Sequence, residues 1–186
     1  MKPDPVVEPH GSLSTEPNGS LSIDVDTRGA AWTAFDQNPT KMCEGILSAA
    51  WSSLSTTNND FEVSVVLADD AMLQQLNKQY RGKDAPTNVL SFPTDLGDDD
   101  RLPDGEPEPL GDIVLSFDTL AHEAADLGIE MRDHFSHLLV HGMLHLIGFD
   151  HETDQDAAEM ESKEIQILAD MGIANPYQVE ESMKNS

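Results

Sequence analysis

Apolar and polar residues alternate along two stretches of the chain, which is the pattern of half-buried strands. The first stretch covers residues 21–26, and the second has apolar side chains at every other position from Phe61 to Leu67. Two short apolar runs, at residues 88–92 and 112–116, also predict strands. The sequence therefore predicts four strands, and the pattern leaves their order in a sheet open.

Apolar residues at intervals of three and four predict helices elsewhere. One covers residues 43–54, and another begins after Asp69 or Asp70, either of which can cap it, and extends to Tyr80. Three more are predicted over about 117–127, 131–148 and 153–171. This order excludes a regular strand–helix alternation, so we expect an α+β domain with about five helices packed around one small four-stranded sheet.

Composition divides the chain of 186 residues into one domain and two tails. Residues 1–20 are rich in proline, glycine and serine, which predicts a disordered N-terminal tail. Residues 21–175 form the predicted domain, and residues 176–186 form a C-terminal tail. Residues 93–110 are rich in acids and prolines and too numerous for a hairpin turn, so we expect an exposed acidic loop there.

The chain is strongly acidic, with 35 acidic and 10 basic side chains and a formal net charge of −25. This charge repels phosphates and excludes a general nucleic-acid coat, so action on RNA requires a local basic patch. The single cysteine, Cys43, excludes a disulfide framework and a four-cysteine zinc site. Neither a membrane-spanning apolar run nor a signal peptide is recognisable, so we expect a soluble, cytoplasmic protein.

Three histidines near residue 145 have the spacing of a metal site. His141 and His145 are one helical turn apart and point the same way. A third ligand requires the helix to stop, and Gly148 can end it in the left-handed conformation. His151 then follows in the returning segment. Three nitrogen ligands leave one position open on a zinc ion, which is the arrangement of a catalytic site at the C-terminal end of a helix.

The spacing matches the metzincin pattern H-E-x-x-H-x-x-G-x-x-H at the three histidines and the glycine. The glutamate that serves as general base in that pattern is replaced by Gly142, which disfavours peptide hydrolysis. The alternative is that these are ordinary surface or core histidines, and the combined spacing disfavours that reading.

Other polar residues near this cluster carry weaker signals. We expect His137 to line the pocket or support a ligand, and His134 to be a solvated or capping residue. His122 and His10 carry no functional signal. Glu164 falls inside the apolar face of the last helix, where a carboxylate needs a partner. We expect it to orient a ligand histidine, with a salt bridge at the rim of the domain as the alternative.

A basic patch stands out in this acidic chain, because Lys78, Arg81 and Lys83 are three of only ten cations. Cations at a helix C-terminus also complement its dipole, which is the plainer explanation. Arg81 presents a planar fork suited to two phosphate oxygens, which lysine cannot copy. Thr87 and Asn88, in the following turn, are either structural or line the pocket.

Short motifs through the chain are similar to those of one known family. They are Leu76-Asn77, Tyr80-Arg81, Lys83-Asp84, Pro86-Thr87-Asn88-Val89-Leu90-Ser91-Phe92-Pro93, Gly111-Asp112-Ile113, His137-Leu138, His141-Gly142, Leu144-His145-Leu146, Gly148, Asp150-His151, Met160 and Glu164. Together they resemble the YbeY family of bacterial endoribonucleases over about residues 61–172. Phe149 stands where tyrosine is frequent in that family, a mild change that should not affect metal binding.

The resemblance implies a mixed sheet with surrounding helices and a zinc-dependent, single-strand-specific endoribonuclease. It implies a role in ribosomal RNA processing, notably maturation of the 3′ end of 16S rRNA, and in ribosome quality control. His141, His145 and His151 are the implied ligands of one zinc ion, and Arg81 and His141 the implied catalytic residues. The implied partners are single-stranded rRNA, small-subunit ribosomal proteins and an assembly GTPase, and no association with a membrane is expected.

Two other functions remain open from the sequence. One is a zinc hydrolase of another substrate class, such as a peptidase, which Gly142 and the basic patch disfavour. The other is a non-catalytic ribosome-assembly factor with a structural metal, which an open coordination position disfavours. Neither the general base nor the attacking group, water or the ribose 2′-hydroxyl, follows from the sequence.

Overall fold

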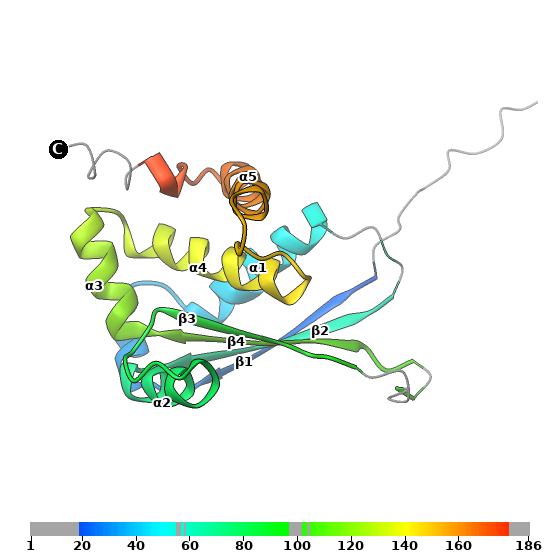
Figure 1. Ribbon diagram of the computed structural model, residues 1–186, viewed down its shortest axis with the longest axis horizontal. Coiled ribbons are helices and arrows are strands. Elements are labelled where there is room, and N and C mark those ends of the chain that lie inside the picture. The colour runs from blue at the N-terminus through cyan, green and yellow to red at the C-terminus, as the bar shows by residue number, and fades with distance from the viewer. Residues whose placement is uncertain (1–18, 55–56, 58, 97–101, 104, 179–186) are drawn as a thin grey trace, which may run out of the picture.

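The structure is a computed structural model, and it describes residues 19–54, 57, 59–96, 102–103 and 105–178 (Figure 1). Most of the two predicted tails and part of the predicted acidic loop lie outside the described residues. Gly19 and Ser20, which the composition assigned to the N-terminal tail, are bonded to the domain. The Trp51 indole N–H donates to the Gly19 carbonyl at 3.0 Å, and the Ser20 N–H donates to the Asp60 carboxylate at 2.7 Å.

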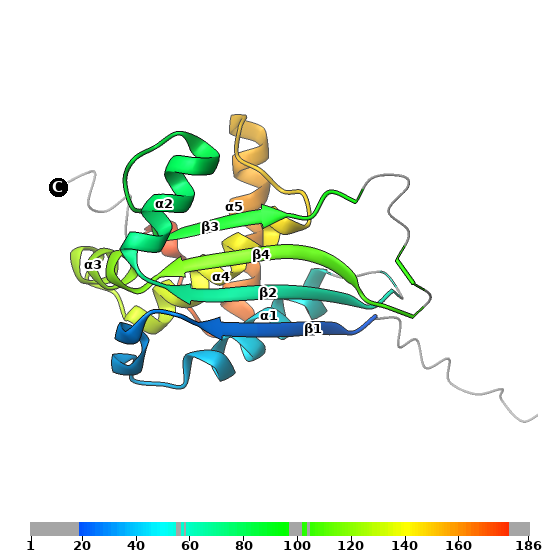
Figure 2. The same ribbon diagram turned by 90° about the horizontal axis from the view of Figure 1, so that it is seen from below.

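A four-stranded mixed sheet forms the centre of the fold. Its strands are β1 (Leu21–Thr27), β2 (Phe61–Ala68), β3 (Val89–Pro93) and β4 (Glu108–Ser116), in the order β1-β2-β4-β3. Strands β1, β2 and β4 are parallel, whereas β3 runs antiparallel to β4 and forms one edge of the sheet (Figure 2). The predicted α+β class with a small mixed sheet is confirmed.

Helices cover the two faces of the sheet unequally. They are η1 (Ala30–Ala34), α1 (Pro39–Leu54), α2 (Asp70–Arg81), α3 (Phe117–Leu127), α4 (Met131–Leu146) and α5 (Asp154–Asp170). Helices α1 and α4 pack on one face with α5 beyond them, and α2 lies on the other face (Figure 1). The larger hydrophobic core therefore lies between the sheet and α1, α4 and α5, and a smaller one lies under α2.

Two features of the fold differ from the sequence-based expectations. Strand β4 begins at Glu108 and not at Asp112, so the predicted loop at 93–110 is shorter than expected. The first residues of β4 pair with β2, and the Thr94 N–H donates to the Leu110 carbonyl of β4 at 2.9 Å. The short helix η1 was not predicted, although it buries Trp32. Both features depend on contacts with distant segments, which an apolar pattern does not record.

Helix α4 crosses the sheet closely at Gly142. A Cβ atom at this position would lie 2.9 Å from Ile113 Cγ2 and 3.1 Å from Ser91 Oγ. The absence of a side chain therefore lets α4 approach β3 and β4, and it brings the histidines of α4 to the edge of the sheet. Position 142 also has no room for a glutamate, which agrees with the missing metzincin base.

Gly142→Ala is expected to lower the free energy of unfolding by about 1 kcal/mol. The added methyl group overpacks the helix–sheet contact at a cost of about 1–3 kcal/mol, and the better helix propensity of alanine recovers up to about 1 kcal/mol. Gly45 of α1 is the matched control, because nothing lies within 4 Å of a Cβ built there. Gly45→Ala should stabilise the protein in the same urea titration. Equal stabilisation by both variants would contradict the close-packing explanation.

Candidate metal centre

The end of α4 shapes the histidine cluster. The helix ends at Leu146, and Gly148 follows with a positive φ of 96°. The Phe149 N–H donates to the Leu144 carbonyl at 3.0 Å, which closes the turn. This left-handed glycine reverses the chain, and the segment after it returns His151 toward the helix.

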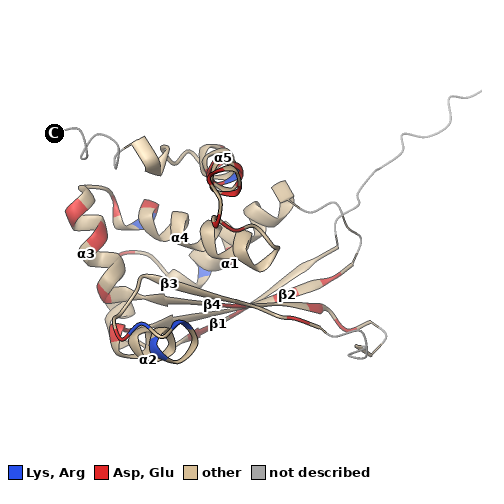
Figure 3. Ribbon diagram, in the orientation of Figure 1, with Lys and Arg blue, Asp and Glu red and all other residues tan. Residues whose placement is uncertain are grey.

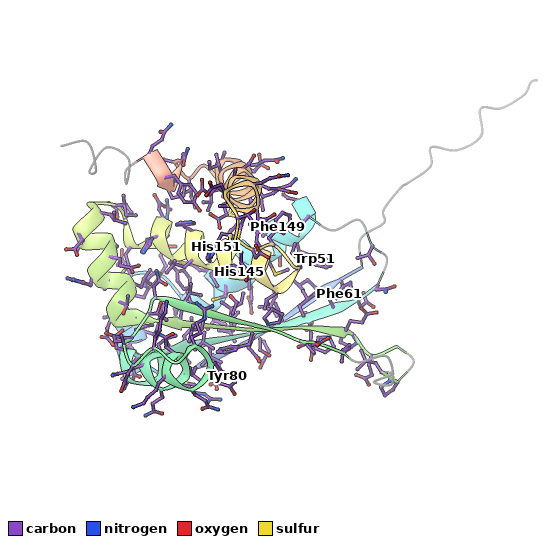
Figure 4. The ribbon with its side chains drawn as sticks, in the orientation of Figure 1. Trp51, Phe61, Tyr80, His145, Phe149 and His151 are labelled. Carbon is purple, nitrogen blue, oxygen red and sulfur yellow. The ribbon has the colours of Figure 1, made fainter. Side chains whose placement is uncertain are left out.

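The structure brings together all three histidines expected to bind metal. Two of them, His145 and His151, are labelled in Figure 4 and lie side by side. The ring centroids of His145 lie 4.6 Å from His141 and 5.1 Å from His151, and those of His141 and His151 are 5.7 Å apart. One ring nitrogen from each residue lies within 4.8 Å of the others. Tetrahedral nitrogen ligands of zinc are about 3.4 Å apart, so the cluster is of the right size for one ion.

The hydrogen bonds of these rings indicate which nitrogens face the cluster. His145 Nδ1 donates to the Phe149 carbonyl at 2.9 Å, and His141 Nδ1 donates to the Glu164 carboxylate at 2.7 Å. Burial lowers the pKa of His145, and electrostatic interactions with His141, His151 and Arg81 lower it further, while the hydrogen bond to Phe149 acts in the opposite direction. His145 Nε2 therefore carries a lone pair, and it faces His141 Nε2 at 3.0 Å. Two ring nitrogens at this distance need a proton or a cation between them, so this pair of donors fits a metal ion.

Glu164 of α5 is fully buried beneath this cluster. It accepts hydrogen bonds from His141, from His137 Nε2 at 3.1 Å, and from the Tyr177 hydroxyl. Burial alone would raise the pKa of Glu164, but the bonds from His137 and His141 outweigh it and lower this pKa to about 2. The expected contact between Glu164 and a candidate ligand histidine is present, and the alternative of a salt bridge at the rim is wrong.

Tyr177 is a site residue that the sequence analysis missed, because it lies in the segment assigned to the C-terminal tail. The local signal for it is the pair Asn175-Pro176, which is typical of a helix start. The Asn175 side chain accepts from the Tyr177 N–H at 2.9 Å and begins a helical turn there. The ring of Tyr177 then packs edge-on against His137, with centroids 5.5 Å apart.

His134 differs from its expected role as a solvated or capping residue. It is only 6% exposed, and its Nε2 atom lies 2.8 Å from the Glu123 carboxylate of α3. The same carboxylate oxygen accepts from the Asn88 side chain at 2.9 Å. The expectation failed because Glu123 reaches His134 from another helix. Asn88 is therefore structural, and it also lines the cavity at the histidine cluster.

Acid is expected to weaken the Glu123 contact. Burial raises the pKa of Glu123, but the hydrogen bonds from His134 and Asn88 outweigh it, so the folded-state pKa lies below the ordinary value of 4.5. A carboxyl group with a lowered pKa in the folded state stabilises the fold at pH values above its pKa in the unfolded state. This stabilisation is lost as the pH falls through its pKa in the folded state. The stability difference between wild type and Glu123→Gln should therefore shrink as the pH of urea titrations falls from 7 to below about 4.5. A difference independent of pH would contradict this assignment.

Arg81 lies at the mouth of the same site. It is the last residue of α2, and it lines a cavity of about 420 Å³ together with the three histidines. Among the described residues, Lys78 forms an ion pair with Asp84 at 2.6 Å, whereas Arg81 forms no ion pair. Of the predicted basic patch, Arg81 is therefore the member placed to meet an anion at the histidine cluster.

The fold and the site together define a class of protein, an α+β domain with a candidate three-histidine metal centre at a helix end. In the described part of the chain, no helix is long and apolar enough to cross a membrane.

Comparison with known proteins gives the family. The family model described as "Endoribonuclease YbeY" matches residues 28–172. Curated proteins of that name include one from Paramagnetospirillum magneticum, 46% identical over 85% of this chain and 96% of the relative. Another, from Jannaschia sp., is 42% identical over 84% of this chain and the relative's whole length. The chain belongs to the endoribonuclease YbeY family, which confirms the resemblance seen in its motifs.

A solved structure is also similar. The solution structure of TM1509 from Thermotoga maritima aligns with a TM-score of 0.44 and 23% sequence identity, over 80% of this chain and 86% of that chain.

Proposed function

We propose that this protein is a zinc-dependent endoribonuclease that cleaves single-stranded RNA. The observation that carries the proposal is the cavity that joins Arg81 to the cluster of His141, His145 and His151. It combines candidate metal ligands with a guanidinium that forms no ion pair with any described residue, and both Lewis-acid assistance and charge neutralisation accelerate phosphodiester cleavage. Membership of a family whose relatives are named endoribonucleases supports the same substrate class.

In this mechanism, His141, His145 and His151 would hold the zinc ion. When bound, zinc supplies a Lewis acid that polarises a phosphate oxygen. The Phe149 carbonyl and Glu164 keep the protons on Nδ1 of His145 and His141, so both Nε2 atoms would be available to bind the ion. His141 is thus a catalytic residue through its place at the metal.

Arg81 has a separate task. Its guanidinium can present two N–H donors to two phosphate oxygens, which fixes the phosphodiester and neutralises charge that develops in the transition state. The Arg81 side chain comes from α2, and the histidines come from α4 and the turn after it. The substrate phosphate therefore lies between elements from opposite faces of the sheet.

The wider biological role belongs to the same proposal. We expect the protein to act in the cytoplasm on ribosomal RNA, in maturation of the 3′ end of 16S rRNA and in ribosome quality control. Small-subunit ribosomal proteins and an assembly GTPase are the expected partners. The motif resemblance supports this role, and the net charge of −25 suits docking onto basic ribosomal proteins.

The test is cleavage of a labelled RNA, single-stranded and as a duplex, before and after zinc removal by a chelator. We expect cleavage of the single strand alone, loss of cleavage on chelation, recovery on adding zinc, and no hydrolysis of a peptide substrate. Full cleavage by the chelated protein would overturn the metal mechanism, and peptide hydrolysis would favour another hydrolase. A 2′,3′-cyclic phosphate on the product would identify the ribose hydroxyl as the attacking group, and a 5′-phosphate would identify water.

A further inference from the structure

Tyr80 is an exposed aromatic side chain at the end of α2. Among the described residues, Tyr80 and Leu96 are the large hydrophobic side chains left exposed, and Tyr80 is 61% exposed. Its ring packs edge-on against Phe92 of β3, with centroids 5.0 Å apart and planes at 62°. The Phe92 contact fixes the ring of Tyr80 and leaves much of its surface open to solvent.

Two cations, Arg81 and Lys83, are close to Tyr80 in the sequence of this acidic chain. Figure 3 shows Lys and Arg on α2, and acidic residues at the start of that helix and on α3 and α5. Arg81 adjoins Tyr80 in the chain, and Lys83 follows Arg81 closely; neither forms an ion pair with a described residue. An exposed aromatic ring beside unpaired cations is the combination that binds single-stranded nucleic acid, in which bases stack and phosphates are neutralised.

Strand β3 connects this ring to the metal centre. Side chains alternate between the faces of a strand, so Ser91 faces Gly142 of α4 and lines the histidine cavity, while Phe92 packs toward α2. Because β3 is an edge strand, the two faces meet there without another strand between them. Figure 4 accordingly shows Tyr80 on the α2 side of the sheet and His145 and His151 on the α4 side. Arg81 follows Tyr80 directly in the chain and lines the histidine cavity.

We propose that Tyr80, held by Phe92, is a stacking platform for an unpaired base of the RNA substrate. The RNA then crosses the edge of the sheet at β3. One of its phosphates lies at Arg81 and the metal centre, and a neighbouring base stacks on Tyr80. A duplex keeps its bases stacked on each other and offers none to the ring, so this contact selects single strands. The inference rests on the proposed ribonuclease function and adds a specificity-determining residue to it.

The experiment measures binding and cleavage separately. The metal-loaded full chain is titrated by fluorescence anisotropy into a 2′-O-methyl strand of about 12 nucleotides, a length within the range of single-strand sites. Tyr80→Ala is expected to weaken binding about tenfold, the lower range for loss of one stacked base. Tyr80→Phe keeps the ring and should bind like wild type. Leu96→Ala, the other exposed apolar side chain, is the matched control and should also bind like wild type.

Cleavage of the unmodified RNA should distinguish Tyr80→Ala from the two control variants in the same way. Tyr80→Ala should raise KM about tenfold with kcat within about twofold, because the ring does not contact the reacting atoms. Equal binding by wild type and Tyr80→Ala, with cleavage intact, would overturn the platform and leave the ribonuclease function standing. A wild-type protein that neither binds nor cleaves the RNA would overturn both the ribonuclease function and the platform.

Discussion

His145→Ala is expected to reduce bound zinc from one ion per chain to nearly none and to reduce RNA cleavage by at least about 10³-fold. The remaining two histidines cannot fill a three-ligand site, and Lewis-acid assistance is worth several kcal/mol, with about 1.4 kcal/mol for each factor of ten. Metal content is measured by elemental analysis of the purified protein, and cleavage by the initial rate on the labelled single strand.

His122→Ala is the matched control for this variant. His122 is an exposed histidine on α3 that pairs with Asp126 at 3.3 Å, away from the cavity. This control should retain zinc and full activity. If His145→Ala lost its zinc but processed RNA as fast as wild type, the metal would be structural, and the assembly-factor interpretation would replace the catalytic one.

Arg81→Ala is expected to lower kcat/KM about 10²–10³-fold while leaving the fold intact. The estimate follows from the effect of removing one donor that stabilises a transition-state anion. The side chain is exposed at the end of α2, so the melting temperature should hardly change. Arg81→Lys should restore only part of the rate, because an ammonium group cannot present the planar pair of donors.

Lys41→Ala serves as the control for the charge change. Lys41 is exposed on α1, outside the cavity that holds Arg81, so its removal should leave kcat/KM close to that of wild type. An equal loss in both variants would show that Arg81 acts through net charge alone. Cleavage by Arg81→Ala at the wild-type rate would remove Arg81 from the mechanism.

The parts of this site that were predictable from the sequence are those set by local geometry. His141 and His145 are one helical turn apart, Gly148 ends the helix and His151 follows within the returning turn, so spacing alone brings them together. Glu164 was predictable because a carboxylate inside an apolar helix face needs a buried partner. Strands β1 and β2 were recognisable for a similar reason, since alternation follows directly from half-burial, and β3 and β4 were recognisable as short apolar runs.

The remaining parts depend on contacts between segments far apart in the chain. The pairing of His134 with Glu123 joins α4 to α3, and Tyr177 reaches Glu164 from beyond the end of α5. The early start of β4 depends on hydrogen bonds with neighbouring strands and not on its own apolar pattern. None of these contacts has a period or spacing in the sequence, so only the folded chain reveals them.

The carboxylate that accepts the hydrogen bond from His141 belongs to Glu164, which comes later in the sequence, and this order matters while the chain is being synthesised. His141 and His145 leave the ribosome before Glu164 and Tyr177, because translation proceeds toward the C-terminus. A nascent chain that has exposed α4 alone still lacks the carboxylate that holds the proton on His141 Nδ1. The hydrogen-bond network of the candidate metal centre is therefore complete only after α5 and the turn that carries Tyr177 have been synthesised and have packed against α4.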